Sequence, residues 1–177
     1  MVADILIVDD EQDIRELVAG IYQPGISAAS FLLRLNEHLH GYLSYDPDAT
    51  HVYSTLEDVV AACGGVCQDF AHFALACARS AGIPARYVSG YLYGGPGSYL
   101  RGESATHAWF ECLLPGGRWL ALDPTNNLVA GDHYIRVHVG RDYTDVSPTR
   151  GAYVGCPASK LDVSVKVVEL NEVAVGA

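Results

Sequence analysis

The sequence predicts an α+β fold in which helices come first along the chain and antiparallel strands follow. Up to about residue 80, apolar residues recur mainly at helical spacing. Beyond residue 85, segments rich in β-branched and aromatic residues alternate with Gly and Pro clusters. Elements segregated in this way are typical of an α+β domain and not of a doubly wound sheet. The 177 residues suffice for one domain with or without a short appendage.

The sequence up to about Leu43 predicts three elements: a strand and two helices. Residues 4–8 are predicted to form a short buried strand, and an amphipathic helix follows that ends at Gly20. The turn sequence at 23–25 is the first candidate boundary. From Ser27 to about Leu43, leucine and phenylalanine recur at helical spacing, which predicts a second helix.

Two further helices precede the strands. Ser54 and Glu57 have the spacing of a capping box, with Ser54 as the N-cap. The next helix is expected to begin at Cys67, run to about Ser80 and end before Gly82. The five predicted strands span residues 87–93, 105–114, 118–123, 134–139 and 161–170.

Composition excludes several classes of partner. Lys and Arg total 11 and Asp and Glu total 21, which gives a formal charge of −10 and argues against nucleic acid and anionic membranes. No apolar run approaches the ~18–20 residues of a membrane helix. Acidic residues enclose the apolar segment at 5–8, unlike a signal peptide, and five cysteines make an odd number. We therefore expect a cytoplasmic protein with free thiols.

Cys67 is the first candidate for chemistry. It follows two glycines and opens a predicted helix. Backbone N–H groups are unpaired at such a position, and the helix dipole there favours a thiolate. The same N–H groups can stabilise an oxyanion. A small buried side chain is the alternative, and it suits Cys77 and Cys112 well.

A nucleophilic cysteine needs a base, and two histidines are candidates. His72 lies five residues beyond Cys67, roughly 140° around the same helix, so we interpret it as structural. His107 lies on a predicted strand that leads through a Pro-Gly-Gly turn into the next strand. It is the better candidate for the base.

The turn between these strands also suggests the group that orients the base. If it closes a hairpin, residue numbers paired across it sum to about 231–233, and Asp123 becomes the diagonal neighbour of His107. Diagonal neighbours are ~7–8 Å apart at the backbone, within reach of side chains. Asp123 could then orient the imidazole, and Asn126 and Asn127 are alternatives.

Five motifs carry a resemblance to a known family. They occur in this order: residues 65–71 (Gly-Val-Cys-Gln-Asp-Phe-Ala), 82–91, 106–109 (Thr-His-Ala-Trp), 122–127 (Leu-Asp-Pro-Thr-Asn-Asn) and 140–148. Together they resemble the bacterial transglutaminase-like superfamily, whose members are often described as cysteine proteases. The resemblance covers about residues 28–170. It implies a papain-like core over residues 25–177, with a Cys-bearing helix packed on an antiparallel sheet.

The resemblance also implies a catalytic triad of Cys67, His107 and Asp123. Animal transglutaminases place a transition-state-stabilising tryptophan upstream of the nucleophile, and this chain has none there. The second oxyanion donor is therefore open. Arg86 is expected to form a structural ion pair with Asp69. The Cys and His residues lack paired zinc-ligand spacing, so we expect no metal and no cofactor.

Residues 1–21 resemble a different family, the opening strand and helix of a response-regulator receiver domain. Asp9 and Asp10 match its acidic metal-binding pair, but the rest of that fold is absent. We interpret residues 1–24 as a receiver-like fragment without phosphotransfer function. Its apolar face is expected either to dock on the core or to remain mobile.

The function predicted from these observations is cysteine-dependent acyl transfer. The preferred reaction is hydrolysis of a peptide or amide bond in a peptide or protein substrate, through a thioester on Cys67. One alternative is a protein-glutamine transglutaminase, in which an amine resolves the thioester. The other is a catalytically silent binding module of the same fold.

Overall fold

The computed structural model describes residues 11–95, 98–103, 105–147, 151, 154–155 and 164–169. The predicted strand at 4–8, Asp9, Asp10 and Cys156 lie outside these residues. In chain order the helices and strands are α1 (Glu11–Ile21), α2 (Ala28–Tyr42), β1 (Ser44–Tyr45), α3 (Leu56–Ala62), β2 (Gly64–Gly65), α4 (Cys67–Ser80), β3 (Ala85–Leu92), β4 (His107–Leu113), β5 (Trp119–Asp123), β6 (Leu128–Val129), β7 (Tyr134–Gly140) and α5 (Tyr143–Val146).

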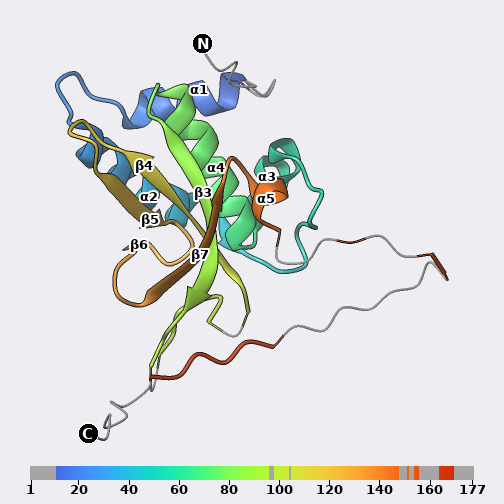
Figure 1. The fold of residues 1–177 in the computed structure, drawn as a ribbon. Coiled ribbons are helices and arrows are strands. Elements are labelled where there is room, and N and C mark those ends of the chain that lie inside the picture. Colours follow the sequence, from blue (N-terminus) through green and yellow to red (C-terminus); the bar gives the residue numbers. More distant parts are fainter. Residues whose placement is uncertain are drawn as a thin grey trace, which may run out of the picture.

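Helices cover one face of an antiparallel sheet. The described strands form a five-stranded sheet in the order β6-β5-β4-β3-β7, and β1 and β2 pair in parallel beside it. α4 packs on β3 and β4, and α2 packs on β5 (Figure 1). The predicted α+β fold, with the Cys-bearing helix on an antiparallel sheet, is confirmed.

Helix α4 is the centre of the core. It spans the predicted range, Cys67–Ser80. Phe70, Phe73 and Cys77 are fully buried in a core that includes Tyr87 and Phe110 of the sheet, and Phe73 packs against Tyr42 of α2. Burial of a large apolar side chain contributes about 1.5–3 kcal/mol, so this core fixes the helix on the sheet.

The cap of α3 differs from the prediction by one residue. Thr55 is the N-cap and forms the capping box with Asp58. The Ser54 hydroxyl instead accepts the backbone N–H of His51 at 3.0 Å. Ser54 therefore closes the preceding turn and is not available to cap the helix.

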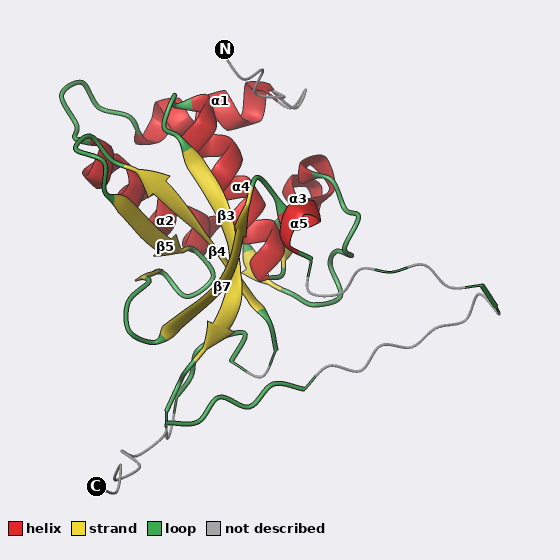
Figure 2. Ribbon diagram, in the orientation of Figure 1, coloured by secondary structure: helices red, strands yellow, loops and turns green. Residues whose placement is uncertain are grey.

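The β4–β5 hairpin has the predicted register. Phe110 pairs with Leu122 and Glu111 with Ala121, so paired residue numbers sum to 232. The chain then passes from β6 at one edge of the sheet to β7 at the other, where β7 pairs with β3 (β6 is labelled in Figure 1, and the strands are yellow in Figure 2). The strand predicted at 161–170 is wrong for residues 164–169, which have no regular structure, and the rest of that range lies outside the described residues.

Helix α1 docks on the other helices. Ile14 and Ile21 are buried within the same core as α4, and α1 packs against α4 and α2. Of the two outcomes considered for this apolar face, the structure has the docked one. No described helix is both long and apolar enough to cross a lipid bilayer.

Candidate active site

Cys67 is held at the first position of α4 by the residues just before it. The Asp69 carboxylate accepts the backbone N–H of Val66 at 2.8 Å and the Thr50 hydroxyl at 2.6 Å. A Cβ atom at Gly65 would lie 2.3 Å from that carboxylate, so only glycine leaves room for this cap. Cys67 itself is partly exposed. It lies in the turn where helical N–H groups have no intrahelical partner.

His107 and Asp123 meet at the open end of the β4–β5 hairpin, as the predicted register requires. His107 is the first residue of β4 and Asp123 the last of β5. The distance from His107 Nε2 to Asp123 Oδ2 is 2.8 Å, and both side chains are fully buried. The carboxylate therefore orients the ring and selects the tautomer or charge state that carries a proton on Nε2.

Every oxygen of Asp123 has donors. Oδ1 accepts the backbone N–H groups of Thr125 and Asn126 at 2.9 and 3.3 Å. Oδ2 accepts the Asn126 amide and the Tyr134 hydroxyl, each at 2.8 Å, besides His107. Burial alone would raise the pKa of this carboxyl, but the hydrogen bonds and the charge of His107 lower it. Asp123 is therefore an ionised carboxylate.

The same contacts favour the charged imidazole. Burial opposes a charge on His107, yet the hydrogen bond to Asp123 and the negative charges of Asp123 and of the nearby Cys67 raise its pKa to about 9. Because Nε2 is bonded to Asp123, Nδ1 is the nitrogen left for Cys67. Nδ1 is buried and has no hydrogen-bond partner among the described residues, so it is available to the thiol. The arrangement suits an imidazolium beside a thiolate.

His72 has a different environment. Its Nε2 accepts the backbone N–H of Tyr143 at 3.1 Å, and its ring lies 5.0 Å from that of Tyr87. Burial lowers the pKa of His72, although nearby carboxylates oppose this effect. A neutral ring that accepts a backbone N–H agrees with the structural role expected from the sequence.

Sequence reasoning missed Tyr134 and the role of Asn126. Tyr134 opens β7, which is distant from Asp123 in sheet order but reaches it because the β6–β7 connection crosses the sheet. Asn126, an expected alternative to Asp123, instead supports it. Its amide also accepts the Arg101 N–H at 2.8 Å and donates to the Arg101 carbonyl at 3.1 Å. Asn127 is bonded to Asn36 and does not orient the imidazole.

Three further residues contribute to the surroundings of the candidate site: Tyr45, Arg101 and Gly102. Tyr45 pairs with Gly65 in the short parallel ladder, two residues before Cys67. Arg101 lies over the Tyr45 ring, with its Cζ 5.5 Å from the ring centroid. Gly102 has φ +92°, and a Cβ there would lie 2.4 Å from His107 Nδ1. No periodicity or spacing in the sequence marks these residues.

The expected Arg86–Asp69 ion pair is wrong. Arg86 pairs with Glu111 at 2.6 Å, and Arg136 shares the same carboxylate. The carboxylate of Asp69 caps α4, and Arg86 lies on β3 directly opposite Glu111. In the ranges that the structure describes, no three His, Cys, Asp or Glu side chains gather in a way that could hold a metal ion.

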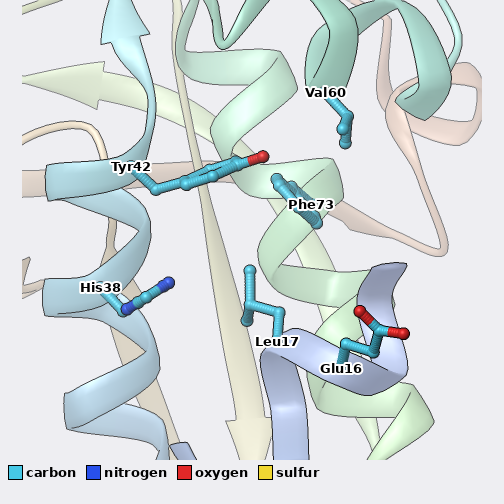
Figure 3. Close-up of a pocket in the computed structure, with 6 residues that line it drawn as sticks. All are labelled: Glu16, Leu17, His38, Tyr42, Val60 and Phe73. Carbon is cyan, nitrogen blue, oxygen red and sulfur yellow. The ribbon is translucent and has the colours of Figure 1, made fainter. Parts of the chain in front are cut away.

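A pocket of about 330 Å³ lies elsewhere, between the helices. Figure 3 shows the lining residues, which come from α1, α2, α3 and α4: Glu16, Leu17, His38, Tyr42, Val60 and Phe73. None of the three predicted catalytic residues lines it.

Comparisons with known proteins agree with this architecture. Residues 15–124 match the sequence profile of the transglutaminase-like superfamily, and the match begins inside α1. An uncharacterized protein of Mycobacterium leprae is 47% identical over 132 residues, which are 72% of this chain and 46% of that protein. The chain thus spans about half the length of this mycobacterial relative.

Two further relatives carry functional names. A protein-glutamine gamma-glutamyltransferase of Pseudomonas aeruginosa is 35% identical over 114 residues, 62% of this chain and 17% of that enzyme. The crystal structure of a proposed cysteine protease from Cytophaga hutchinsonii superposes with a TM-score of 0.65 at 27% identity, covering 77% of this chain and 45% of that one. The profile match covers most of the chain, including the helix and hairpin described above, and the chain therefore belongs to the transglutaminase-like superfamily.

Proposed function

We propose that this protein is a cysteine-dependent acyl-transfer enzyme that hydrolyses peptide or amide bonds, with Cys67, His107 and Asp123 as its triad. The observation that carries the proposal is the buried 2.8 Å contact between His107 Nε2 and Asp123, which leaves Nδ1 for the thiol. The pKa of the buried His107 imidazole is raised to about 9 by specific partners, and titratable groups perturbed in this way are common at functional sites. Its partner Cys67 lies at a helix N-terminus.

Transfer of the thiol proton from Cys67 Sγ to His107 Nδ1 gives the thiolate–imidazolium pair from which the reaction begins. The thiolate attacks the carbonyl carbon, and a C–S bond forms as the carbonyl oxygen gains the electron pair. Collapse of this adduct breaks the C–N bond, and Nδ1–H protonates the departing amine. Water then gives a proton to Nδ1 and attacks the thioester, which releases the acid and restores the thiolate.

The oxyanion of the adduct needs hydrogen-bond donors. The backbone N–H of Cys67, at the first position of α4, is one candidate. The Tyr45 hydroxyl is our candidate for the second. Burial and the neighbouring Cys67 raise the pKa of this hydroxyl, although Arg101 opposes the effect, so it stays protonated and able to donate. In this proposal Tyr45 takes the role of the tryptophan that is absent upstream of Cys67.

The test is mass spectrometry of the protein during incubation with a library of peptide amides. An acyl adduct on Cys67, together with a released amine, is the expected result. The Cys67→Ala variant should show no adduct, and Cys77→Ala serves as the matched control that keeps it. Failure to find an adduct with any peptide in the library, or an adduct on another cysteine, would count against the proposal.

The same experiment separates hydrolysis from transamidation. In water enriched in ¹⁸O, hydrolysis incorporates one label into the released acid. With a primary amine present, a transglutaminase would form a new amide instead, and the name of the Pseudomonas relative makes this the second candidate function. A cytoplasmic location and a peptide or protein substrate stay predictions.

A further inference from the structure

Arg101 brings a positive charge to the rim of the candidate site. Its guanidinium lies over the ring of Tyr45, 5.5 Å from the centroid. Tyr45 is held beside the start of α4 by its pairing with Gly65. The phenol is close enough to both Cys67 and Arg101 for each to influence its ionisation. The guanidinium and the phenol are therefore neighbours, and the charge of Cys67 is felt at the phenol.

The backbone of Arg101 is tied to the triad. The Asn126 amide accepts its N–H at 2.8 Å and donates to its carbonyl at 3.1 Å, while the same amide donates to Asp123 at 2.8 Å. Gly102, the next residue, lies against His107 Nδ1. The base of the Arg101 side chain is thus placed with respect to the reacting groups.

The charge of Arg101 has no carboxylate partner among the residues that the structure describes. Arg86 and Arg136 both pair with Glu111, and Arg141 pairs with Asp145. Arg101 is exposed, and its guanidinium lies over the aromatic face of Tyr45. In a chain with a net charge of −10, a guanidinium without a carboxylate partner, on a loop bonded to Asn126, has N–H donors that a ligand can use.

We propose that Arg101 determines substrate choice by binding a carboxylate of the acyl donor, so that the preferred substrates are acidic peptide amides. The proposal rests on the function proposed above, since it presumes that acyl transfer takes place on Cys67. A guanidinium binds a carboxylate through two parallel N–H···O bonds, which gives both attraction and orientation. Stacking on Tyr45 preorganises the side chain for this contact.

The first test needs no substrate. Iodoacetate and iodoacetamide alkylate the same thiol and differ by one carboxylate, so the ratio of their rates on Cys67 reports the local positive charge. His107 contributes to this ratio in every variant, and only the change on Arg101→Gln is diagnostic. We expect Arg101→Gln to lower the iodoacetate-to-iodoacetamide ratio by about 3- to 10-fold, with the iodoacetamide rate nearly unchanged.

Arg118→Gln is the matched control. Arg118 is an exposed arginine at the turn of the β4–β5 hairpin, at the end opposite His107 and Asp123, and its loss should leave the ratio as it is. If Arg101→Gln keeps the wild-type ratio while Cys67 remains the first thiol to react, the role of Arg101 is overturned and the proposed function stands. If Cys67 shows no preferential alkylation, both are overturned.

The second test uses peptidyl aminocoumarin amides. One pair carries Glu or Gln at the residue with the scissile carbonyl, and a second pair carries a free or amidated α-carboxylate nearby. Wild-type protein should prefer the Glu peptide, or the free α-carboxylate, by about 10-fold in kcat/KM, and Arg101→Gln should abolish that preference. Which pair responds identifies the source of the carboxylate. Equal rates within both pairs in the wild-type protein would contradict the proposal.

Discussion

The first turn of α4 and the middle of the same helix give cysteine opposite environments. Cys67 is partly exposed, lies at the helix start and interacts with His107. Cys77, further along the helix, is fully buried, and burial raises the pKa of its thiol to about 12. One helix therefore carries a thiol that can ionise beside a base and a thiol that serves only as a small apolar side chain.

Histidine shows the same contrast across α4 and β4. His72, in the second turn of α4, accepts a backbone N–H, and burial lowers its pKa. His107 is more deeply buried, yet contacts with Asp123 and Cys67 raise its pKa to about 9. Burial alone does not decide the charge of these rings. The partner at each ring nitrogen decides it: a backbone N–H for His72 and the Asp123 carboxylate for His107.

The contrast between Cys67 and Cys77 predicts the largest effect of a substitution on turnover. Cys67→Ala should lower turnover of peptide amides by about 10⁴-fold or more, because it removes the nucleophile. Cys77→Ala should keep turnover and cost about 1 kcal/mol of the free energy of unfolding, because it only removes a buried atom. Steady-state kinetics and urea denaturation of both variants measure this. Comparable loss of turnover in both variants would contradict the assignment of Cys67 as the nucleophile and of Cys77 as a buried apolar side chain.

The two histidines predict the next effect. His107→Asn should lower kcat by about 10²- to 10⁴-fold through loss of the proton acceptor. His72→Asn keeps an acceptor for the Tyr143 N–H and should change kcat by no more than about 3-fold. The comparison is sharpest if both variants have wild-type circular dichroism spectra. A greater loss of kcat in His72→Asn would exchange the roles assigned to the two rings.

Tyr45→Phe sharpens the comparison at the thiol itself. The variant keeps the ring beneath Arg101 and removes the hydroxyl, so the proposed oxyanion donor is lost without a change of shape. We expect kcat to fall by about 10²-fold with KM nearly unchanged, since the donor acts mainly in the transition state. A rise in KM at constant kcat would instead assign Tyr45 to substrate binding.

Gly102→Ala should give the smallest loss of kcat. The larger losses are those expected for Cys67→Ala, His107→Asn and Tyr45→Phe. The new Cβ would lie 2.4 Å from His107 Nδ1, at a φ of +92° that side chains rarely adopt, so the ring or the loop must shift. A shift of less than an ångström costs about 10- to 100-fold in kcat. Gly116→Ala is the control, because it has a similar φ and nothing within 4 Å. Equal effects of the two substitutions on kcat would show that backbone strain, and not contact with His107, is responsible.

Short stretches of sequence were enough to predict the helix that carries Cys67 and the hairpin that carries His107 and Asp123. The extent of α4 follows from its apolar period and its glycine boundaries, and the β4–β5 register follows from one short turn. The hairpin alone brings His107 to Asp123, and α4 carries Cys67. The Ser54 cap failed because two adjacent hydroxyl residues compete for the same helix start.

The remaining parts depend on contacts between distant segments. Tyr134 reaches Asp123 only because β7 adds to the far side of β3, and no local pattern specifies that crossing. Arg101 and Gly102 lie in a loop whose path is set by hydrogen bonds to Asn126. The predicted ion-pair partner of Arg86 was wrong for the same reason. The β3–β4 register places Glu111 opposite Arg86, and a long connection between the two strands separates these residues in the sequence.

The central claim is that His107 activates Cys67, and selective alkylation tests it most directly. At about pH 6–7, well below the pKa of His107 of about 9, the imidazolium is present and should keep Cys67 reactive. Brief treatment with iodoacetamide followed by peptide mapping should therefore label Cys67 well before exposed Cys63 and buried Cys77. In His107→Asn, labelling of Cys67 should fall to the rate of Cys63. Equal labelling of Cys63 and Cys67 in the wild-type protein, or an unchanged rate in His107→Asn, would contradict the account.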